Sequence, residues 1–409
     1  MKANTVFQPT EILLPDFSRI DGTRWATVAC DQYTSQPDYW AGLRELVGNA
    51  PSTLHLMLPE IDLDRGEERI PQIHRAMETA LKEWLIPYPD AMILLERTQA
   101  DGRVRRGIVG AVDLEAYDYR PGAVSPIRAT EGTVLERIPP RVRIRCGAPI
   151  EMPHVMLLFD DPGHTVIDPL LPQCASLPLL YDFDLNGNGG HVRGHLLGKA
   201  EQLRVTDALD ALCQGQGAHP LLFAVGDGNH SLASAKAAYE EIKAAIGENA
   251  ARSHPARYAL AEIVNLHDPA LDFEPIYRVV FDTDPDALLA RLTAYAAGLN
   301  GAAGAEAFRI VTSAGERTLT VPHPQYRLPV ATLQAFLDSC PGLNIDYIHG
   351  EDALRALAAQ PSAVGFLFRG MEKSDLFPAV LSDGALPRKT FSMGHAHDKR
   401  FYLECRKLR

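Results

Sequence analysis

The stretch from Leu221 to Lys236 reads Leu-Leu-Phe-Ala-Val-Gly-Asp-Gly-Asn-His-Ser-Leu-Ala-Ser-Ala-Lys. Its short apolar run, residues 221–225, is typical of a buried strand. After a polar turn, apolar residues recur at helical spacing at Leu232, Ala235, Tyr239, Ile242 and Ile246. The pattern predicts a strand, a short glycine-containing turn and an amphipathic helix.

The turn between this strand and helix contains the leading candidate residues. A helix start presents backbone N–H groups and the positive end of the helix dipole, which favour an anion such as phosphate. Gly226 and Gly228 allow a ligand to approach the backbone closely. Asp227, Asn229 and Ser231 all suit the N-cap position, and the alternative is that one of them only caps the helix, for about 1 kcal/mol.

Only one residue can be the cap, so two polar side chains and His230 would remain at the same helix end, which favours a functional role. Asp227 can accept a proton or hold a divalent cation, and His230 can act as an acid, a base or a phosphate partner. A carboxylate repels phosphate unless a metal or a proton intervenes. The turn therefore predicts Mg²⁺ bound at Asp227.

The composition limits the class of protein. A chain of 409 residues can form two or more domains or one large intertwined unit. We expect a catalytic region at residues 1–250 and a C-terminal α/β region at residues 251–409, with a single intertwined unit as the alternative. A hydrophobic content of 46% excludes disorder, and a net charge of −12 argues against a nonspecific nucleic-acid surface. Small-molecule partners fit this charge better. A homodimer stays open as an oligomeric state.

Cysteine usage and the N-terminus indicate the compartment. The six cysteines are scattered and form no C-x-x-C pair, which is typical of reduced thiols rather than of a zinc site or a disulfide framework. The N-terminus has no cationic segment followed by an apolar one, and no run approaches the roughly 18 apolar residues of a membrane helix. We therefore expect a soluble cytoplasmic protein without a membrane partner.

Helix and strand patterns alternate irregularly along the chain. Residues 70–84 have helical periodicity, and residues 91–95 and 104–112 flank an Asp101-Gly102 turn, which predicts a hairpin. Arg141, Arg143 and Arg145 alternate with apolar residues, which predicts a strand with three guanidinium groups on one face. Residues 186–191 and 299–305 are expected to be loops.

Three further segments combine polar groups suited to a ligand. Arg128 and Glu131 lie in Arg-Ala-Thr-Glu-Gly-Thr, where an internal ion pair is the competing explanation. Arg388 and Lys389 lie in Pro-Arg-Lys-Thr-Phe-Ser-Met-Gly-His, which suits a phosphate clamp or a solvated basic turn. Asp31 follows a predicted strand, where catalytic carboxylates often lie, although it could instead only organise a turn.

Several motifs together resemble one family, although no P-loop or Rossmann fingerprint occurs. They are Trp25-Ala-Thr-Val-Ala-Cys-Asp-Gln-Tyr-Thr-Ser-Gln-Pro37, Arg128-Ala-Thr-Glu-Gly-Thr133, Asp227-Gly-Asn-His-Ser231, His349-Gly-Glu-Asp352 and Leu386-Pro-Arg-Lys-Thr-Phe-Ser-Met-Gly394. On these motifs the chain resembles, over nearly its whole length, the family catalogued as domain of unknown function 1015 (DUF1015). The resemblance implies an α+β, or mixed α/β, fold with a ParB/sulfiredoxin-like core and large family-specific additions.

The Asp-Gly-Asn-His turn resembles the family's commoner Asp-Gly-His-His-Arg turn, which also occurs in ParB/sulfiredoxin-like free serine kinases. Asn229 and Ser231 stand here for the usual His and Arg. The resemblance implies that Asp227 and His230 contact serine or its phosphate, together with Mg²⁺, ATP or ADP and a separate carboxylate, for which Asp31 is our candidate. Lys236, or Arg388 and Lys389, could replace the missing Arg.

The leading hypothesis is an enzyme that interconverts serine and O-phosphoserine, as a nucleotide-linked kinase or running toward serine, with Asp31 or Asp227 handling the hydroxyl proton. In this hypothesis Gly228, Asn229, Ser231, Arg128 and Glu131 bind the substrate or its phosphate, together with the cations named above. One alternative is a catalytically inactive regulatory protein that binds a nucleotide or an amino acid. A further alternative is a ParB-type nucleic-acid-acting protein, which would need a local basic groove.

Overall fold

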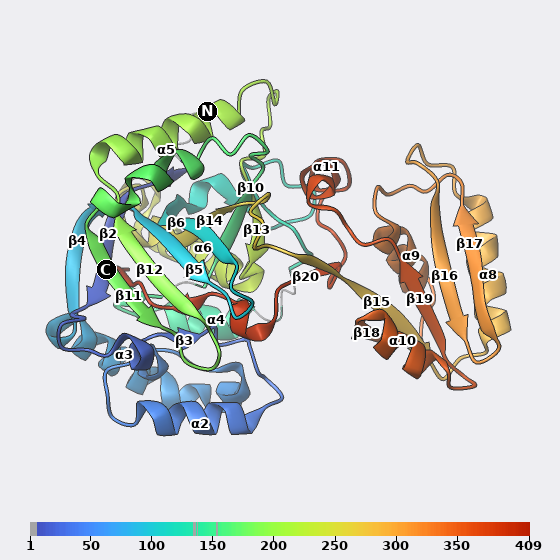
Figure 1. Ribbon diagram of the computed structural model, residues 1–409, viewed down its shortest axis with the longest axis horizontal. Coiled ribbons are helices and arrows are strands. Elements are labelled where there is room, and N and C mark those ends of the chain that lie inside the picture. Colours follow the sequence, from blue (N-terminus) through green and yellow to red (C-terminus); the bar gives the residue numbers. More distant parts are fainter. Residues whose placement is uncertain (1–5, 134–135, 137, 153) are drawn as a thin grey trace. The chain divides into compact units, whose positions relative to one another are not determined.

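The computed structural model describes residues 6–133, 136, 138–152 and 154–409. The chain forms two compact units (Figure 1). Unit 1 comprises Met1–Ala129, Thr133–Leu271 and His395–Arg409, and unit 2 comprises Thr130–Gly132 and Asp272–Gly394. The expected boundary between residues 250 and 251 therefore falls within unit 1, and the C-terminal 15 residues, 395–409, return to that unit.

Unit 1 is built on a mixed ten-stranded sheet in the order β11-β12-β5-β6-β14-β10-β13-β8-β7, with β1 paired to β6. The strands are β1 (Phe7–Gln8), β5 (Ile93–Thr98), β6 (Val104–Asp113), β7 (Tyr117–Asp118), β8 (Ile127–Ala129), β10 (Met156–Phe159), β11 (Leu179–Asp184), β12 (His191–Leu196), β13 (Phe223–Asp227) and β14 (Tyr258–Asn265). Three of its pairs, β10 with β14, β13 with β8 and β7 with β8, are parallel. The expectation of a mixed α/β fold is confirmed.

Both faces of this sheet are buried. Along β5, Ile93 and Leu95 join one apolar cluster while Leu94 joins another, because successive side chains of a strand point to opposite faces. Figure 1 shows helix α5 on one side of unit 1 and α2 and α3 on the other. The helices of unit 1 are α1 (Gly22–Trp25), α2 (Pro37–Val47), α3 (Gly66–Glu83), α4 (Ile138–Arg145), α5 (Lys199–Leu212), α6 (Asn229–Ile246) and α7 (Glu248–Ala251).

The C-terminal segment is integrated into unit 1 through two short strand pairs. Strand β21 (Phe401–Tyr402) pairs with β3 (Thr27–Val28), and β22 (Arg406–Lys407) pairs with β9 (Ile150–Glu151). Elsewhere in unit 1, outside the C-terminal segment, β2 (Thr10–Pro15) pairs with β4 (Leu85–Ala91). Because Phe401 to Leu403 are buried, the C-terminal segment contributes to the core of unit 1.

Unit 2 contains an antiparallel sheet in the order β17-β16-β19-β15-β18, with β20 paired to β15. Its strands are β15 (Phe273–Phe281), β16 (Glu306–Thr312), β17 (Gly315–Val321), β18 (Asn344–His349), β19 (Val364–Phe368) and β20 (Phe391–Met393). Its helices are α8 (Pro285–Gly298), α9 (Pro329–Asp338), α10 (Glu351–Ala358) and α11 (Leu376–Asp383).

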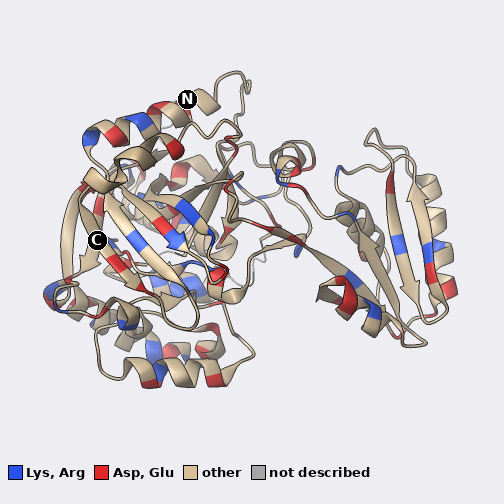
Figure 2. Cartoon of the chain, in the orientation of Figure 1, with Lys and Arg blue, Asp and Glu red and all other residues tan. Residues whose placement is uncertain are grey.

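Most local predictions are confirmed. The predicted strand and helix around residue 227 are β13 and α6, the helix at residues 70–84 is α3, and β5 and β6 form the hairpin around Asp101-Gly102, where Gly102 has a φ of +85°. The two predicted loops connect β11 to β12 and α8 to β16. Both signs of charge are interspersed over the elements in Figure 2.

The prediction of an arginine-rich strand at residues 141–145 is wrong, because these residues form helix α4. Pro139 and Pro140 lie in its first turn, where proline is tolerated because the N–H groups there have no intrahelical partner. Arg141 and Arg145, one helical turn apart, form ion pairs with Glu60 and Glu151, respectively. The alternation of arginine with apolar residues had suggested a strand, but the two arginines that form ion pairs are four residues apart, on the same side of a helix.

Candidate active site

The candidate site begins where β13 ends and α6 starts. Asp227 is the last residue of the strand, and Gly228 occupies the N-cap position with a left-handed backbone, φ +79° and ψ 28°. Within the described residues no side chain caps α6, so the alternative in which Asp227, Asn229 or Ser231 is the cap is not what the structure has. Asp227 Oδ1 instead accepts the N–H of Gly228 at 2.8 Å.

Glycine is favoured at position 228. The positive φ is costly for other residues, and a Cβ there would lie 3.1 Å from Val155 Cα and 3.4 Å from His154 Cδ2. The start of α6 therefore packs directly against the segment that carries His154.

His154 brings the two predicted carboxylates into one cluster. Its Nε2 lies 3.6 Å from Asp31 Oδ2, and its Nδ1 lies 3.0 Å from the hydroxyl of Tyr402. That hydroxyl also accepts the backbone N–H of Cys30 at 3.3 Å. Burial lowers the pKa of His154, but the negative charges of Asp31 and Asp227 outweigh burial and raise it above 6.5.

Asp31 is held ionised in this cluster. Burial raises the pKa of its carboxyl group, but the charge and close approach of His154, the hydrogen bond from Gln32 and the charge of Lys399 together lower it far below its usual range. Gln32 Nε2 donates to Asp31 Oδ1 at 3.0 Å. The carboxyl group of Asp31 is therefore ionised at neutral pH.

Lys399 completes the cluster. Its Nζ lies 3.4 Å from Asp227 Oδ2, and both side chains are less than one-fifth exposed. The segment before Lys399 is anchored by two buried guanidinium groups, since Arg97 Nη2 donates to the carbonyl of His397 at 2.9 Å and Arg105 Nη1 to that of Asp398 at 3.1 Å. The site therefore has a positioned ammonium group beside its carboxylates.

A small cavity of about 120 Å³ adjoins the cluster. His154, Tyr402, Cys30, Ser231 and Ser234 line it together with apolar side chains, among them those of Leu56, Met57, Leu58, Met77, Ile144 and Met152. Ser231, predicted from the turn, thus faces the same space as His154.

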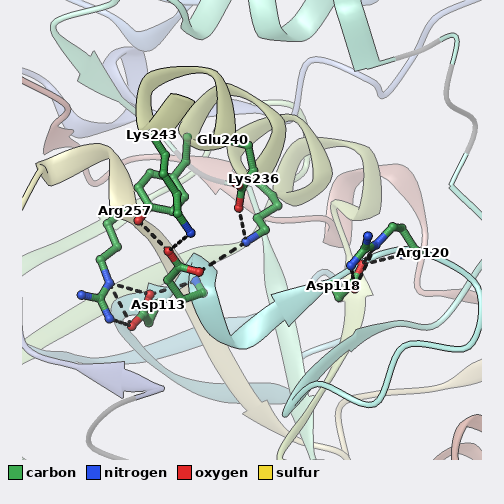
Figure 3. Close-up of polar contacts among 9 residues, drawn as sticks. Asp113, Asp118, Arg120, Lys236, Glu240, Lys243 and Arg257 are labelled. Atoms are coloured by element: carbon green, nitrogen blue, oxygen red, sulfur yellow. Dashed lines mark hydrogen bonds and ion pairs between the residues drawn. The ribbon is translucent and has the colours of Figure 1, made fainter. Parts of the chain in front are cut away.

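The other charged residues predicted to bind the substrate have structural partners or lie in unit 2. Lys236 pairs with Glu240 at 2.6 Å and lies 3.9 Å from Glu115, within the ionic network of Figure 3. Arg128 donates to the backbone carbonyls of Ser125 and His219, both at 2.9 Å. Glu131, Arg388 and Lys389 belong to unit 2.

Sequence reasoning nominated Asp31 and Asp227 but missed His154, Lys399 and Tyr402. The available signal for His154 was its place directly before the apolar run Val155–Phe159, comparable to the place of Asp31 shortly after a strand. Lys399 and Tyr402 had no local signal, because the approach of the C-terminal segment is a long-range contact.

No group of three or more His, Cys, Asp or Glu side chains that could hold a metal ion by themselves is present among the described residues. A metal at Asp227 would therefore need ligands from a substrate or from water. None of the helices in the described part of the chain combines the length and apolar character needed to cross a membrane.

Comparisons with known structures give weak overall similarity. A mutant free serine kinase in complex with AMP has 10% identity and a TM-score of 0.40, covering 75% of this chain and 92% of that one. A conserved hypothetical protein from Pyrococcus furiosus has 11% identity and a TM-score of 0.34, covering 69% and 89%. C-terminally truncated SbnI from Staphylococcus aureus has 8% identity and a TM-score of 0.36, covering 70% and 82%.

No curated protein matches the sequence. A family model described as "Protein of unknown function (DUF1015)" matches residues 15–340, which span both carboxylates and His154 of the candidate site. The chain therefore belongs to the DUF1015 family, as its motifs predicted.

Proposed function

We propose that this protein is a small-molecule phosphotransfer enzyme that interconverts serine and O-phosphoserine with an adenine nucleotide as donor or acceptor. The observation that carries the proposal is the convergence of Asp31 and Asp227 on His154 and Lys399. Phosphoryl transfer depends mainly on positioning and on charge stabilisation, for which a cluster of fixed charges is suited.

Each charged group has a role in this proposal. In the direction from serine, Asp31, held ionised, orients the serine hydroxyl group and accepts its proton as the new O–P bond forms. The bond between the transferred phosphoryl group and the nucleotide breaks in the same step, and the nucleotide leaves with one phosphate fewer. Lys399 neutralises negative charge on the phosphoryl oxygens, taking the part that the family's usual Arg would have at Ser231. The positive end of the α6 dipole lies at the same turn and acts in the same direction.

His154 acts as a positioning residue. Its imidazole lies between Asp31 and the hydroxyl of Tyr402, so it fixes the orientation of the Asp31 carboxylate. Asn229 and His230 start α6 and are the proposed contacts to the substrate.

The donor set fits Mg²⁺, which proteins usually bind through one or two carboxylates together with substrate phosphates. Asp227 would hold the ion, with the remaining ligands supplied by the substrate phosphate and by water. When bound, the ion neutralises charge that develops on the transferred group.

The choice of serine rests on the Asp227–Ser231 turn, which resembles the turn of free serine kinases. Phosphorus NMR of the purified protein with Mg²⁺ tests it, with O-phosphoserine offered with and without ADP, and serine offered with ATP or ADP. We expect conversion in one of these mixtures. It should be lost in Asp227→Asn and Asp31→Asn and retained in Asp207→Asn, which changes an exposed carboxylate of α5.

Absence of conversion in every mixture would overturn the proposal and would favour a regulatory protein that binds a nucleotide or an amino acid. Conversion that survives both site substitutions would show that another site performs the chemistry.

A further inference from the structure

Unit 2 contains a polar cavity of about 350 Å³ that none of the proposed chemistry uses. One wall is a single face of α9, because Ala331, Gln334, Ala335 and Asp338 recur at helical spacing. The two alanines leave space beside the amide and the carboxylate. The rest of the lining is Tyr326, Tyr347, Asp383, Ala385, Leu386, Pro387 and Arg388.

One buried guanidinium group fixes the walls of this cavity. Arg278 is fully buried, and its Nε donates to Gln334 Oε1 at 3.1 Å. Its Nη2 and Nη1 donate to the carbonyls of Arg388 and Lys389 at 3.1 and 2.9 Å. Its Cζ also lies 4.8 Å from the ring centroid of Tyr347. Helix α9, the Arg388 loop and Tyr347 are therefore held in one arrangement.

The side of the cavity at Arg388 is positively charged. The hydrogen-bond acceptors of Arg278 are an amide and backbone carbonyls, so no carboxylate in the described part of the chain forms an ion pair with it. Arg388 is exposed, and its guanidinium group has no hydrogen bond or ion pair to any described residue. The ammonium group of Lys389 lies 5.0 Å from the Tyr347 ring centroid. This side can accept a carboxylate.

The α9 side supplies a negative charge. Asp338 Oδ1 accepts a hydrogen bond from Gln334 Nε2 at 2.9 Å, and its Oδ2 has no partner among the described residues. Asp383 is less available, because its two oxygens accept the backbone N–H of Arg327 at 2.8 Å and the hydroxyl of Ser382 at 2.6 Å. Asp338 is therefore the carboxylate that can accept an ammonium group.

We infer that this cavity binds a free α-amino acid. The ligand carboxylate pairs with Arg388, the ligand ammonium group pairs with Asp338, and an apolar side chain packs against Tyr326 and Tyr347. A zwitterion can pair with both charged walls, whereas a simple amine or acid can pair with only one of them. The inference is independent of the phosphotransfer proposal, since every lining residue belongs to unit 2.

Isothermal titration calorimetry of the full chain tests this site with matched ligands. The probes are L-leucine and L-phenylalanine, their decarboxylated analogues isopentylamine and phenethylamine, and their deaminated analogues isocaproate and hydrocinnamate. We expect at least one amino acid to bind saturably, with both of its analogues at least about tenfold weaker.

Substitutions of exposed residues test the contribution of each charged wall separately. Asp338→Asn and Arg388→Gln should each weaken amino-acid binding about tenfold or more. Asp352→Asn in α10 and Arg291→Gln in α8 change exposed residues outside the lining and should leave binding unchanged. The inference is overturned if neither amino acid binds, if an analogue binds as tightly as its parent, or if binding survives both cavity substitutions.

Discussion

Lys399 is the residue on which the proposed phosphate chemistry depends most directly. In Lys399→Met we expect phosphotransfer to fall by about 100-fold, because a positioned charge that stabilises the transition state is lost. Stability should also fall, since the substitution leaves the largely buried carboxylate of Asp227 without its ammonium partner at 3.4 Å. Initial rates from phosphorus NMR and the melting temperature measure the two effects.

Lys236→Met provides the matched control for this substitution. It breaks the ion pair with Glu240 at 2.6 Å in the network of Figure 3 and should leave the rate unchanged. Equal rate losses in the two variants would assign both lysines a structural role.

The His154–Asp31 pair predicts a pH-dependent stability. The folded-state pKa of His154 is raised above 6.5, so its contribution is fully present below pH 6.5 and is lost as the pH rises through the raised value. The contribution of Asp31 is lost only as the pH falls below 3.8 and on through its lowered pKa, so it is constant in the neutral range.

Melting temperatures from about pH 5 to pH 9 test whether the stabilising contribution of His154 falls as the pH rises. The difference between the wild type and His154→Gln should be largest at the acidic end and should shrink toward the alkaline end. His219→Gln, which alters an exposed histidine, should give a difference that does not vary with pH. A difference that grows with pH would show that His154 is buried as the neutral form.

At the scale of elements, the start of α6 depends on Gly228. Gly228→Ala adds a Cβ 3.1 Å from Val155 Cα in a backbone with φ +79°, so we expect a loss of about 1–3 kcal/mol and a lower rate. Gly247→Ala, at the other end of α6, has nothing within 4 Å of its Cβ, so it should cost backbone strain alone. This strain should exceed that at Gly228, because φ +82° with ψ 156° is a region nearly restricted to glycine, whereas Gly228 has the left-handed backbone. Denaturant unfolding compares the two. A loss at position 228 that is smaller than the loss at position 247 would show that the close approach to the His154 segment contributes little.

Local patterns in the sequence predicted those elements whose signals are themselves local. The apolar run before Asp227 and the Asp101-Gly102 turn correctly gave β13 and the β5–β6 hairpin. Helix α4 was missed because the arginines from Arg141 to Arg145 recur at every second residue, which is the spacing of a strand. The two prolines before them are tolerated in the first turn of a helix, and the partner of Arg145, Glu151, could not be read from the local pattern. For the same reason Asp31 could be nominated from its place after a strand, whereas Lys399 acquires its partner only through a contact between distant segments.

For the whole molecule, the separate hydrophobic clusters of the two units predict separate opening reactions. Arg278→Met leaves the amide oxygen of Gln334 and the carbonyls of Arg388 and Lys389 without their buried donor, at a cost of about 1–3 kcal/mol for each unsatisfied group. Native-state hydrogen exchange should therefore accelerate by about tenfold or more in β15 and β18, while β13 and α6 of unit 1 keep their protection. Uniform acceleration across both units would instead mean that the chain unfolds as one cooperative body, and the phosphotransfer site and the amino-acid cavity would then share a single stability.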